Sequence, residues 1–385
     1  IPAASYISRV GYKRFVYGGW GMRVLFIFVM ALVPLTYGFL NSAAQLSLML
    51  FLLFCFNLSR GISSCAWLPW IFSLVPASIR GRYLAWDSGC VQTASFIAFI
   101  VAGLVLGSHP RHVHFSIIFA FSALMGAASL SFLKRIPDGP GPSASSSSSG
   151  PVPWLAMAQY RPFKKLLILN LVWSAAYGGM TAFSVAYLKS EAGLSEGTIL
   201  FVSSVTFLGG LLSPWFGSRM DQMGSKPVMT FAFIGWLIIC AGWALLAGKI
   251  LHPGWRLILS LELLMGLGVA LFNMSNIRLA MAISPEMGRN HFFALFSVVA
   301  NVSLGISPVF WGLMIDLFHN LNLQTGVFEW NRYSLFFSVA GAMFVVVLIC
   351  CRRLEEPAAA KIQKLIREIV VATPYRMWVR LFGRD

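Results

Sequence analysis

The chain has 385 residues, of which 58% are hydrophobic and only 11% are charged, and its formal net charge is +16. Soluble domains carry about a quarter charged residues, and a single soluble core stops growing near roughly 300 residues. The composition therefore excludes a soluble globule and predicts a protein embedded in lipid. The positive charge does not indicate nucleic-acid binding, because the basic residues lie in short gaps between apolar runs.

Apolar runs long enough to cross about 30 Å of hydrocarbon recur along the whole chain. We predict ten complete membrane spans, four before a polar break and six after it. The spans lie near residues 22–40, 46–75, 90–108, 114–133, 166–188, 198–217, 228–248, 256–282, 291–318 and 333–351. Residues 1–8 have the composition expected for the end of a further span.

Lysine and arginine accumulate on one side of these spans. If the connections alternate between the two sides, 23 of the 29 basic residues fall on one side, Arg23 among them. Five fall on the other side, and Arg60 lies inside a span. Because loops rich in Lys and Arg stay in the cytoplasm, we expect the basic side, including the C-terminus, to be cytoplasmic. The membrane is expected to be a bacterial inner membrane or a plasma membrane.

A Gly/Ser/Pro-rich stretch at residues 140–153 cannot bury apolar surface and is typical of a flexible linker. It predicts an N-terminal bundle at 1–136, a linker at 137–162 and a C-terminal bundle at 163–352. The remaining tail, 353–385, is basic, with apolar residues at helical spacing between its lysines and arginines. This pattern favours an amphipathic helix on an anionic cytoplasmic leaflet, or alternatively a surface for a regulatory partner.

The two halves of the chain repeat each other, which is common in membrane transporters. Gly11 and Lys13 match Gly224 and Lys226 at an offset of 213. A second loop repeats at an offset of 209, where Pro76, Arg80, Tyr83 and Ala85 match Pro285, Arg289, Phe292 and Ala294.

The repeat also predicts what precedes the first residue. Shifting the first two spans of the second half back by about 211 residues places one whole counterpart, and most of another, before Ile1. We therefore expect that a first helix and most of a second are absent from this chain. The alternative is a ten-helix protein that begins here.

The chain resembles the major facilitator superfamily, whose signature loop runs Gly-x-x-x-Asp-x-x-Gly-x-Lys/Arg. The resemblance implies an all-α polytopic membrane protein with two pseudo-repeated six-helix bundles joined by a cytoplasmic linker. The first-half copy of the loop is poorer, since Ser8 stands in the place of the aspartate. The matching residues are Gly217, Arg219, Asp221, Gly224 and Lys226 in the second half, and Gly11, Lys13 and Arg14 in the first.

These loop charges have two interpretations. Asp221 lies beside Arg219 and Lys226 near a helix end, so charge pairs and helix dipoles can latch the cytoplasmic helix ends in one of two states. Alternatively, the charges only set the topology. Arg80 and Arg289, in the second repeated loop, belong to the same set of gating candidates.

Two charged residues lie within predicted spans, Arg60 and Glu262. A charge at the bilayer centre costs roughly 2.5–3.5 kcal/mol on insertion scales, so each should face a cavity or a partner. Polar and aromatic residues accompany both at helical spacing, which predicts a lined substrate pathway or, alternatively, polar contacts that hold helices together. The pathway candidates are Asn57, Arg60, Ser64, Trp67, Asn170, Trp173, Tyr177, Glu262, Asn273 and Asn276.

Arg60 can bind an anionic group on a substrate or pair with Glu262 across the two halves. Glu262 can take up a proton during a transport cycle, which would make the protein proton-coupled. The expected partners are a small molecule of unknown class, a coupling proton and the lipid bilayer, with no nucleic acid. We expect a monomer without a cofactor.

The sequence is compatible with two functions, and neither is enzymatic. The first is secondary active transport of a small solute by alternating access, with import and export equally open. The second is a non-transporting membrane sensor or scaffold of the same fold. There is no Gly-rich phosphate loop followed by Lys-Ser/Thr and no nucleophile elbow, so no catalytic residue is predicted. The histidines at 109, 112 and 114 have no carboxylate or thiolate beside them, so no metal site is predicted.

Overall fold

Long apolar helices dominate the computed structural model, which describes residues 10–75, 80–107, 109–138, 154–283, 289–354 and 356. Within these residues, ten helical segments are long and apolar enough to cross a membrane, which confirms the predicted number. Helices are expected there because lipid offers no hydrogen-bond partners, so each segment must satisfy its own backbone. The predicted end of an earlier helix at residues 1–8, the low-complexity stretch and the tail from residue 357 lie outside the described residues.

The first half contains four of these spans. Its elements are α2 (Tyr12–Leu32), the 3₁₀ turn η1 (Val33–Thr36), α3 (Ser42–Leu74), α4 (Arg80–Leu106) and α5 (His112–Arg135). The first span begins about ten residues earlier than the predicted 22–40. It runs from Tyr12 to Thr36, so Arg23 lies in its middle and not in a loop before it.

The second half contains the other six spans, two of which are interrupted. Its elements are α6 (Trp154–Gln159), α7 (Arg161–Tyr177), α8 (Met180–Ser190), α9 (Glu196–Leu211), α10 (Pro214–Met223), α11 (Ser225–Ala247), α12 (Trp255–Ile283), α13 (Arg289–Leu317), the strands β1 (Leu323–Thr325) and β2 (Phe328–Trp330), and α14 (Arg332–Arg352). Part of the predicted linker is therefore helical, since α6 lies within 137–162.

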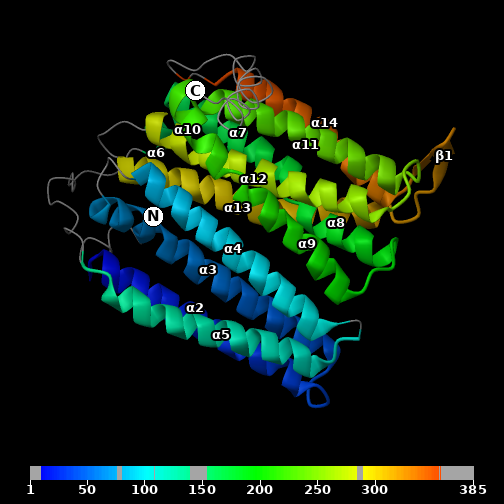
Figure 1. Ribbon diagram of the computed structural model, residues 1–385, viewed down its shortest axis with the longest axis horizontal. Helices are drawn as coiled ribbons and strands as arrows, with labels where there is room; N and C mark the ends of the chain where they lie inside the picture. Colours follow the sequence, from blue (N-terminus) through cyan, green and yellow to red (C-terminus); the bar gives the residue numbers. More distant parts are fainter. Residues whose placement is uncertain are drawn as a thin grey trace, which may run out of the picture.

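Figure 1 shows the spans running between two ends of the molecule. We call the end that carries the C-terminal ends of α5 and α14 the linker side. We call the opposite end, which carries the antiparallel strands β1 and β2, the hairpin side. Most basic residues of the described ranges fall on the linker side.

The backbone agrees with the predicted repeat. Gly11 and Gly224 are matched in the sequence, and both adopt a positive φ, +86° and +89°, immediately before a helix. Such a φ is accessible to glycine at little cost, which explains the residue type at both positions. Arg80 and Arg289, matched in the second loop, both lie in helices, α4 and α13.

A dense aromatic core holds the second half together. Fully buried rings from α11 and α14 form its centre, and α7 and α12 add further rings around them. Trp236 and Phe344 stack almost in parallel with centroids 5.1 Å apart, and Trp243 stacks on Phe337 at 5.4 Å. The buried clusters of the first half are smaller, such as the one formed by Val16, Ala66, Trp70 and Leu133.

The two halves meet mainly along one pair of helices, α4 and α9, with a smaller contact between α3 and α13 (Figure 1). Near the hairpin side, the α4 and α9 backbones touch, because a Cβ on Gly103 would lie 3.1 Å from the Gly197 carbonyl oxygen. Phe99 and Phe207 meet edge to face at 4.8 Å further along. We call this contact the α4–α9 seam.

Candidate functional site

Two buried asparagines join the first helix of the second half to α12. Asn170 on α7 and Asn276 on α12 are 2% and 6% exposed, and their amides bond reciprocally, at 3.1 and 2.7 Å. Asn170 also donates to the Leu166 carbonyl oxygen at 2.8 Å. The structure therefore brings together two residues that the sequence placed in the same candidate pathway, and buries them inside the second half.

Aromatic rings continue this contact toward the hairpin side. Trp173 stacks on Phe272 of α12 with ring centroids 3.9 Å apart, and on Tyr177, one turn along α7, at 5.2 Å. The Tyr177 hydroxyl pairs with the Thr181 hydroxyl at 3.3 Å. Trp173 is buried in the aromatic core, whereas Tyr177 is half-buried, so Tyr177 is the more accessible of the two rings.

The helix that carries this stripe breaks at Gly178 and Gly179, between α7 and α8. The Ala175 carbonyl oxygen accepts two bonds from α13 instead, from Trp311 Nε1 at 2.7 Å and from the Ser307 hydroxyl at 3.3 Å. These donors stabilise the interruption, because a carbonyl left unpaired in a membrane is costly.

Glu262 lies at the contact between α9 and α12. Its carboxylate accepts a 2.6 Å hydrogen bond from the Thr206 hydroxyl, and the residue is only 3% exposed. The two helices approach closely here, since a Cβ on Gly266 would collide with the Thr206 carbonyl oxygen. Among the described residues, no cation lies within ion-pair distance of Glu262, so a pair with Arg60 is not formed in this state.

The described candidates on α3, and Asn273 on α12, are less buried than most of those above. Arg60 and Asn57 are exposed, and Asn57 donates to the Leu53 carbonyl oxygen of its own helix at 2.9 Å. Trp67 is half-buried and packs on Trp20 of α2, with ring centroids 5.3 Å apart. The side chain of Ser64 lies outside the described part of the structure, and Asn273 is exposed on α12.

The signature loop of the second half joins two helices in a reciprocal way. Both carboxylate oxygens of Glu356 accept backbone N–H groups at the start of α11, from Ser225 and Lys226, each at 2.8 Å. In return, Lys226 Nζ donates to the carbonyl oxygens of Arg352 and Leu354 at the end of α14, both at 2.9 Å. An anion at a helix N-terminus and a cation at a C-terminus are both favourable.

The remaining loop candidates are only partly described. Gly217, Arg219 and Asp221 lie in helix α10, but the side chains of Arg219 and Asp221 lie outside the described part, as do those of Arg80 and Arg289. Lys13 is half-buried and Arg14 is exposed. Sequence reasoning missed the partner of Lys226, because Glu356 is 130 residues away and outside the signature.

We expect Glu356→Gln to lower the free energy of unfolding by about 1–2 kcal/mol, because an amide has only one acceptor oxygen for two N–H groups and no charge for the helix terminus. Thermal unfolding of the purified protein measures the change. The matched control is Glu191→Gln, an exposed residue whose ion pair with Arg332 spans 3.9 Å and should contribute little. Equal midpoints for the two variants would contradict the capping role.

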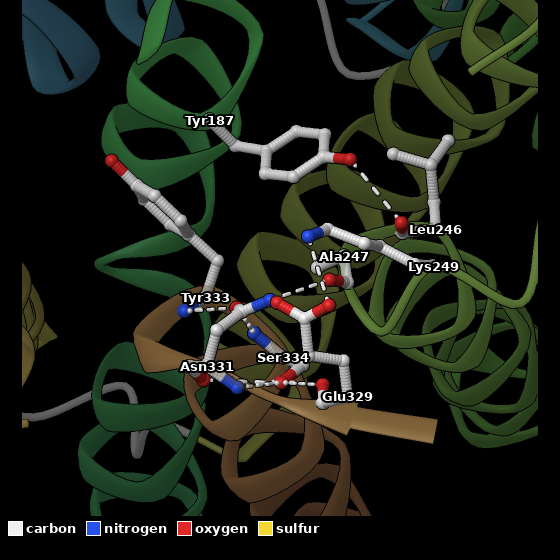
Figure 2. A network of polar contacts seen from close by, with 8 residues as sticks. All are labelled: Tyr187, Leu246, Ala247, Lys249, Glu329, Asn331, Tyr333 and Ser334. Atoms are coloured by element: carbon white, nitrogen blue, oxygen red, sulfur yellow. Dashed lines mark hydrogen bonds and ion pairs between the residues drawn. The ribbon is translucent and has the colours of Figure 1, made fainter. Parts of the chain in front are cut away.

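A second network fixes the hairpin side of the second half, as Figure 2 shows. Three consecutive carbonyl oxygens at the end of α11 receive donors from other elements: Leu246 from the Tyr187 hydroxyl at 3.2 Å, Ala247 from Asn331 Nδ2 at 2.7 Å, and Gly248 from the Glu329 N–H at 3.0 Å. Helix C-termini leave such carbonyls unpaired, so these bonds tie α8, α11 and β2 together.

Lys249 completes this network. Its Nζ lies 2.8 Å from a Glu329 carboxylate oxygen, and the hydrogen bond and negative charge of Glu329 raise the pKa of Lys249. Because the linker side is tied by Lys226 and Glu356, α11 is held at both ends.

No group of three His, Cys, Asp or Glu side chains that could hold a metal occurs within the described ranges.

Membrane-crossing helices in two repeated halves, with interrupted helices and ionisable residues at depth, define the class of polytopic membrane transport proteins. The family model described as "Major Facilitator Superfamily" matches residues 1–248 and 178–384. The chain belongs to the major facilitator superfamily.

Solved transporters share the fold at low sequence identity. The inward-open xylose transporter of E. coli superposes with a TM-score of 0.68 and 15% identity, covering 94% of this chain and 84% of its own. The E. coli fucose:proton symporter gives 0.60 and 14%, covering 92% and 87%. A nucleoside transporter gives 0.61 and 15%, with the same coverage. No curated protein sequence matches the chain.

Proposed function

We propose that the protein is a secondary active transporter that moves a small solute by alternating access. The observation that carries this proposal is the α4–α9 seam, where two separately packed halves meet mainly along one helix pair. Two rigid bodies joined by a narrow seam can tilt against each other, so that the seam parts and a midplane site is exposed to either side in turn. The capping networks at both ends of α11 support the rigidity of the second half.

The linker side is proposed to be the cytoplasmic side, because most of the basic residues fall there. In this arrangement the exposed polar side chains within spans, Asn57, Arg60 and Asn273, are proposed to face the solute together with half-buried Tyr177. The buried pair Asn170 and Asn276 is proposed to hold α7 against α12 behind them.

Glu262 is proposed as the site of a coupling proton. A carboxylate within a span is costly when charged, unless it has a partner. Within the described part of the chain, the hydrogen bond to Glu262 comes from a neutral hydroxyl, which can serve a charged or a protonated carboxyl group equally. A proton taken up from one side and released to the other would couple solute movement to a proton gradient.

The solved neighbours are named for fucose, xylose and nucleosides, and they share only the fold with this chain. Several classes of solute are therefore tested in parallel. Purified full-length protein in liposomes is supplied with a labelled sugar, a nucleoside or a short organic acid. Uptake of at least one class should saturate with concentration and exceed that of empty liposomes. Saturable uptake of none would favour the alternative, a membrane sensor or scaffold with the same fold.

We expect Glu262→Gln to remove the dependence of uptake on an imposed pH gradient while leaving solute exchange without a gradient. Glutamine keeps the shape and the acceptor oxygen facing Thr206 but cannot carry the proton. The control is Asp316→Asn, which removes an exposed carboxylate at the hairpin end of α13. Gradient-driven uptake that persists in Glu262→Gln, with the same dependence as in Asp316→Asn, would contradict the coupling role.

A further inference from the structure

Two arginines lie at membrane depth in the first half, one on each of two adjacent helices. Arg23 is near the middle of the span Tyr12–Thr36, about 17 Å along α2 from its start at 1.5 Å per residue. Arg60 is within the span Ser42–Ser63 of α3. The helices run side by side, with the Ser59 hydroxyl donating to the Gly19 carbonyl oxygen at 3.0 Å, so the arginines approach each other.

The contacts of Arg23 leave its Nε–H group without an acceptor among the described residues. Its guanidinium lies over the rings of Trp20 and Phe56, at 4.8 and 5.1 Å from their centroids. These contacts occupy the face of the guanidinium, whereas its N–H groups point outward from the edge. Arg23 Nε is buried and has no hydrogen-bond partner within the described part of the chain. Arg60 lies within electrostatic range, and its side chain is exposed.

Acidic residues to neutralise this pair are scarce. Of the 13 acidic residues, only Asp87 and Asp138 precede Glu191 in the sequence. Asp138 follows the end of α5 on the linker side, and neither carboxylate makes an ion pair with Arg23 or Arg60. Glu262, the acidic residue at depth in the second half, is buried against Thr206.

Two like charges close together in a membrane are unfavourable unless an anion joins them. We propose that Arg23 and Arg60 form a binding site for an organic anion, with its carboxylate or phosphate between the guanidinium groups and an aromatic or apolar body against Trp20 and Phe56. Guanidinium edges match such oxyanions with paired N–H donors. The inference names the substrate class and rests on the proposed transport function, but binding tests it separately from transport.

The test is calorimetric titration of the full-length protein in phosphatidylcholine nanodiscs. The probes are phenyl phosphate, neutral benzyl alcohol and cationic benzylammonium. We expect phenyl phosphate to bind and the other two not to bind detectably. Arg23→Gln and Arg60→Gln should each weaken phenyl phosphate binding by about tenfold or more, the usual loss for a charge-assisted contact.

Arg135→Gln is the matched control, because Arg135 is an exposed arginine of the same half, in the last turn of α5, and belongs to neither set of candidates. It should bind phenyl phosphate like the unmodified protein. Arg23→Lys and Arg60→Lys, which keep the charge, should bind more tightly than the glutamine variants. If Arg23→Gln does not fold, Arg60→Gln decides the matter, since exposed Arg60 has little packing to lose.

A second titration in phosphatidylglycerol nanodiscs separates two sources of the anion. Weaker phenyl phosphate binding there would identify a lipid headgroup as a competitor for the site, whereas unchanged binding would identify a soluble anion. Equal binding of the anion and the neutral probe, or anion binding undiminished in both glutamine variants, would overturn the proposal. Saturable uptake of a neutral solute alongside that result would leave the transport function standing.

Discussion

Gly266→Ala is expected to lower the free energy of unfolding by about 3 kcal/mol, a large effect for one added methyl group. The new Cβ would collide with the carbonyl oxygen of Thr206 on α9. That oxygen belongs to a helix backbone, so it cannot move aside as a flexible side chain would. Gly209, on the facing helix, approaches the Leu263 carbonyl in the same way. The two glycines thus bring α9 and α12 into backbone contact.

Gly235→Ala is the matched control for this substitution. Gly235 lies within α11, also in a span, and a Cβ there would meet no atom within 4 Å. Alanine should stabilise that helix by about 0.5–1 kcal/mol, because glycine loses more backbone freedom on folding. Both variants are compared by detergent-denaturant titration followed by tryptophan fluorescence. Equal midpoints would mean that α9 and α12 do not approach as closely as described.

Hydropathy alone determines the number of spans, so this number could be predicted from the sequence. The start of the first span could not be predicted in the same way. Hydropathy predicts a first span from about residue 22, whereas the helix begins at Tyr12. Tyr12, Lys13, Arg14 and Gly18 make the first turns polar or flexible, so a hydropathy window rejects them. This difference matters for function. A span that starts near residue 22 places Arg23 with the loop residues, so the sequence does not predict its position beside Arg60.

In the candidate site, residue spacing predicts which side chains share a helix face but not which helix packs against that face. Helical periodicity correctly placed Asn170, Trp173 and Tyr177 on one face of one helix. It could not say which helix covers that face, and three of the contacts that fix the geometry are far apart in sequence. Asn170 meets Asn276 across 106 residues, Thr206 meets Glu262 across 56, and Lys226 meets Glu356 across 130.

An oxidised cysteine pair at positions 92 and 210 is expected to abolish uptake, to about a tenth or less of the reduced level, because rocking of the halves requires the α4–α9 seam to open. Gln92 on α4 lies against Gly210 on α9, with its Cγ 3.4 Å from where a Gly210 Cβ would be. Cysteines there fall near the 3.5–4.5 Å Cβ separation of a disulfide. Uptake into liposomes is measured in a chain otherwise free of the six native cysteines, before and after a reductant.

The control cross-link joins two helices of the same half. A Cβ on Gly341 of α14 would lie 3.3 Å from Cys240 Cβ on α11, so Gly341→Cys with Cys240 retained can form a disulfide inside the second half. That bond should leave uptake unchanged, because α11 and α14 are already fixed to each other at both ends. If the 92–210 bond forms and uptake continues, the halves do not move apart at this seam. If both bonds stop uptake equally, the second half does not act as a rigid body, and flexing within it is part of the cycle.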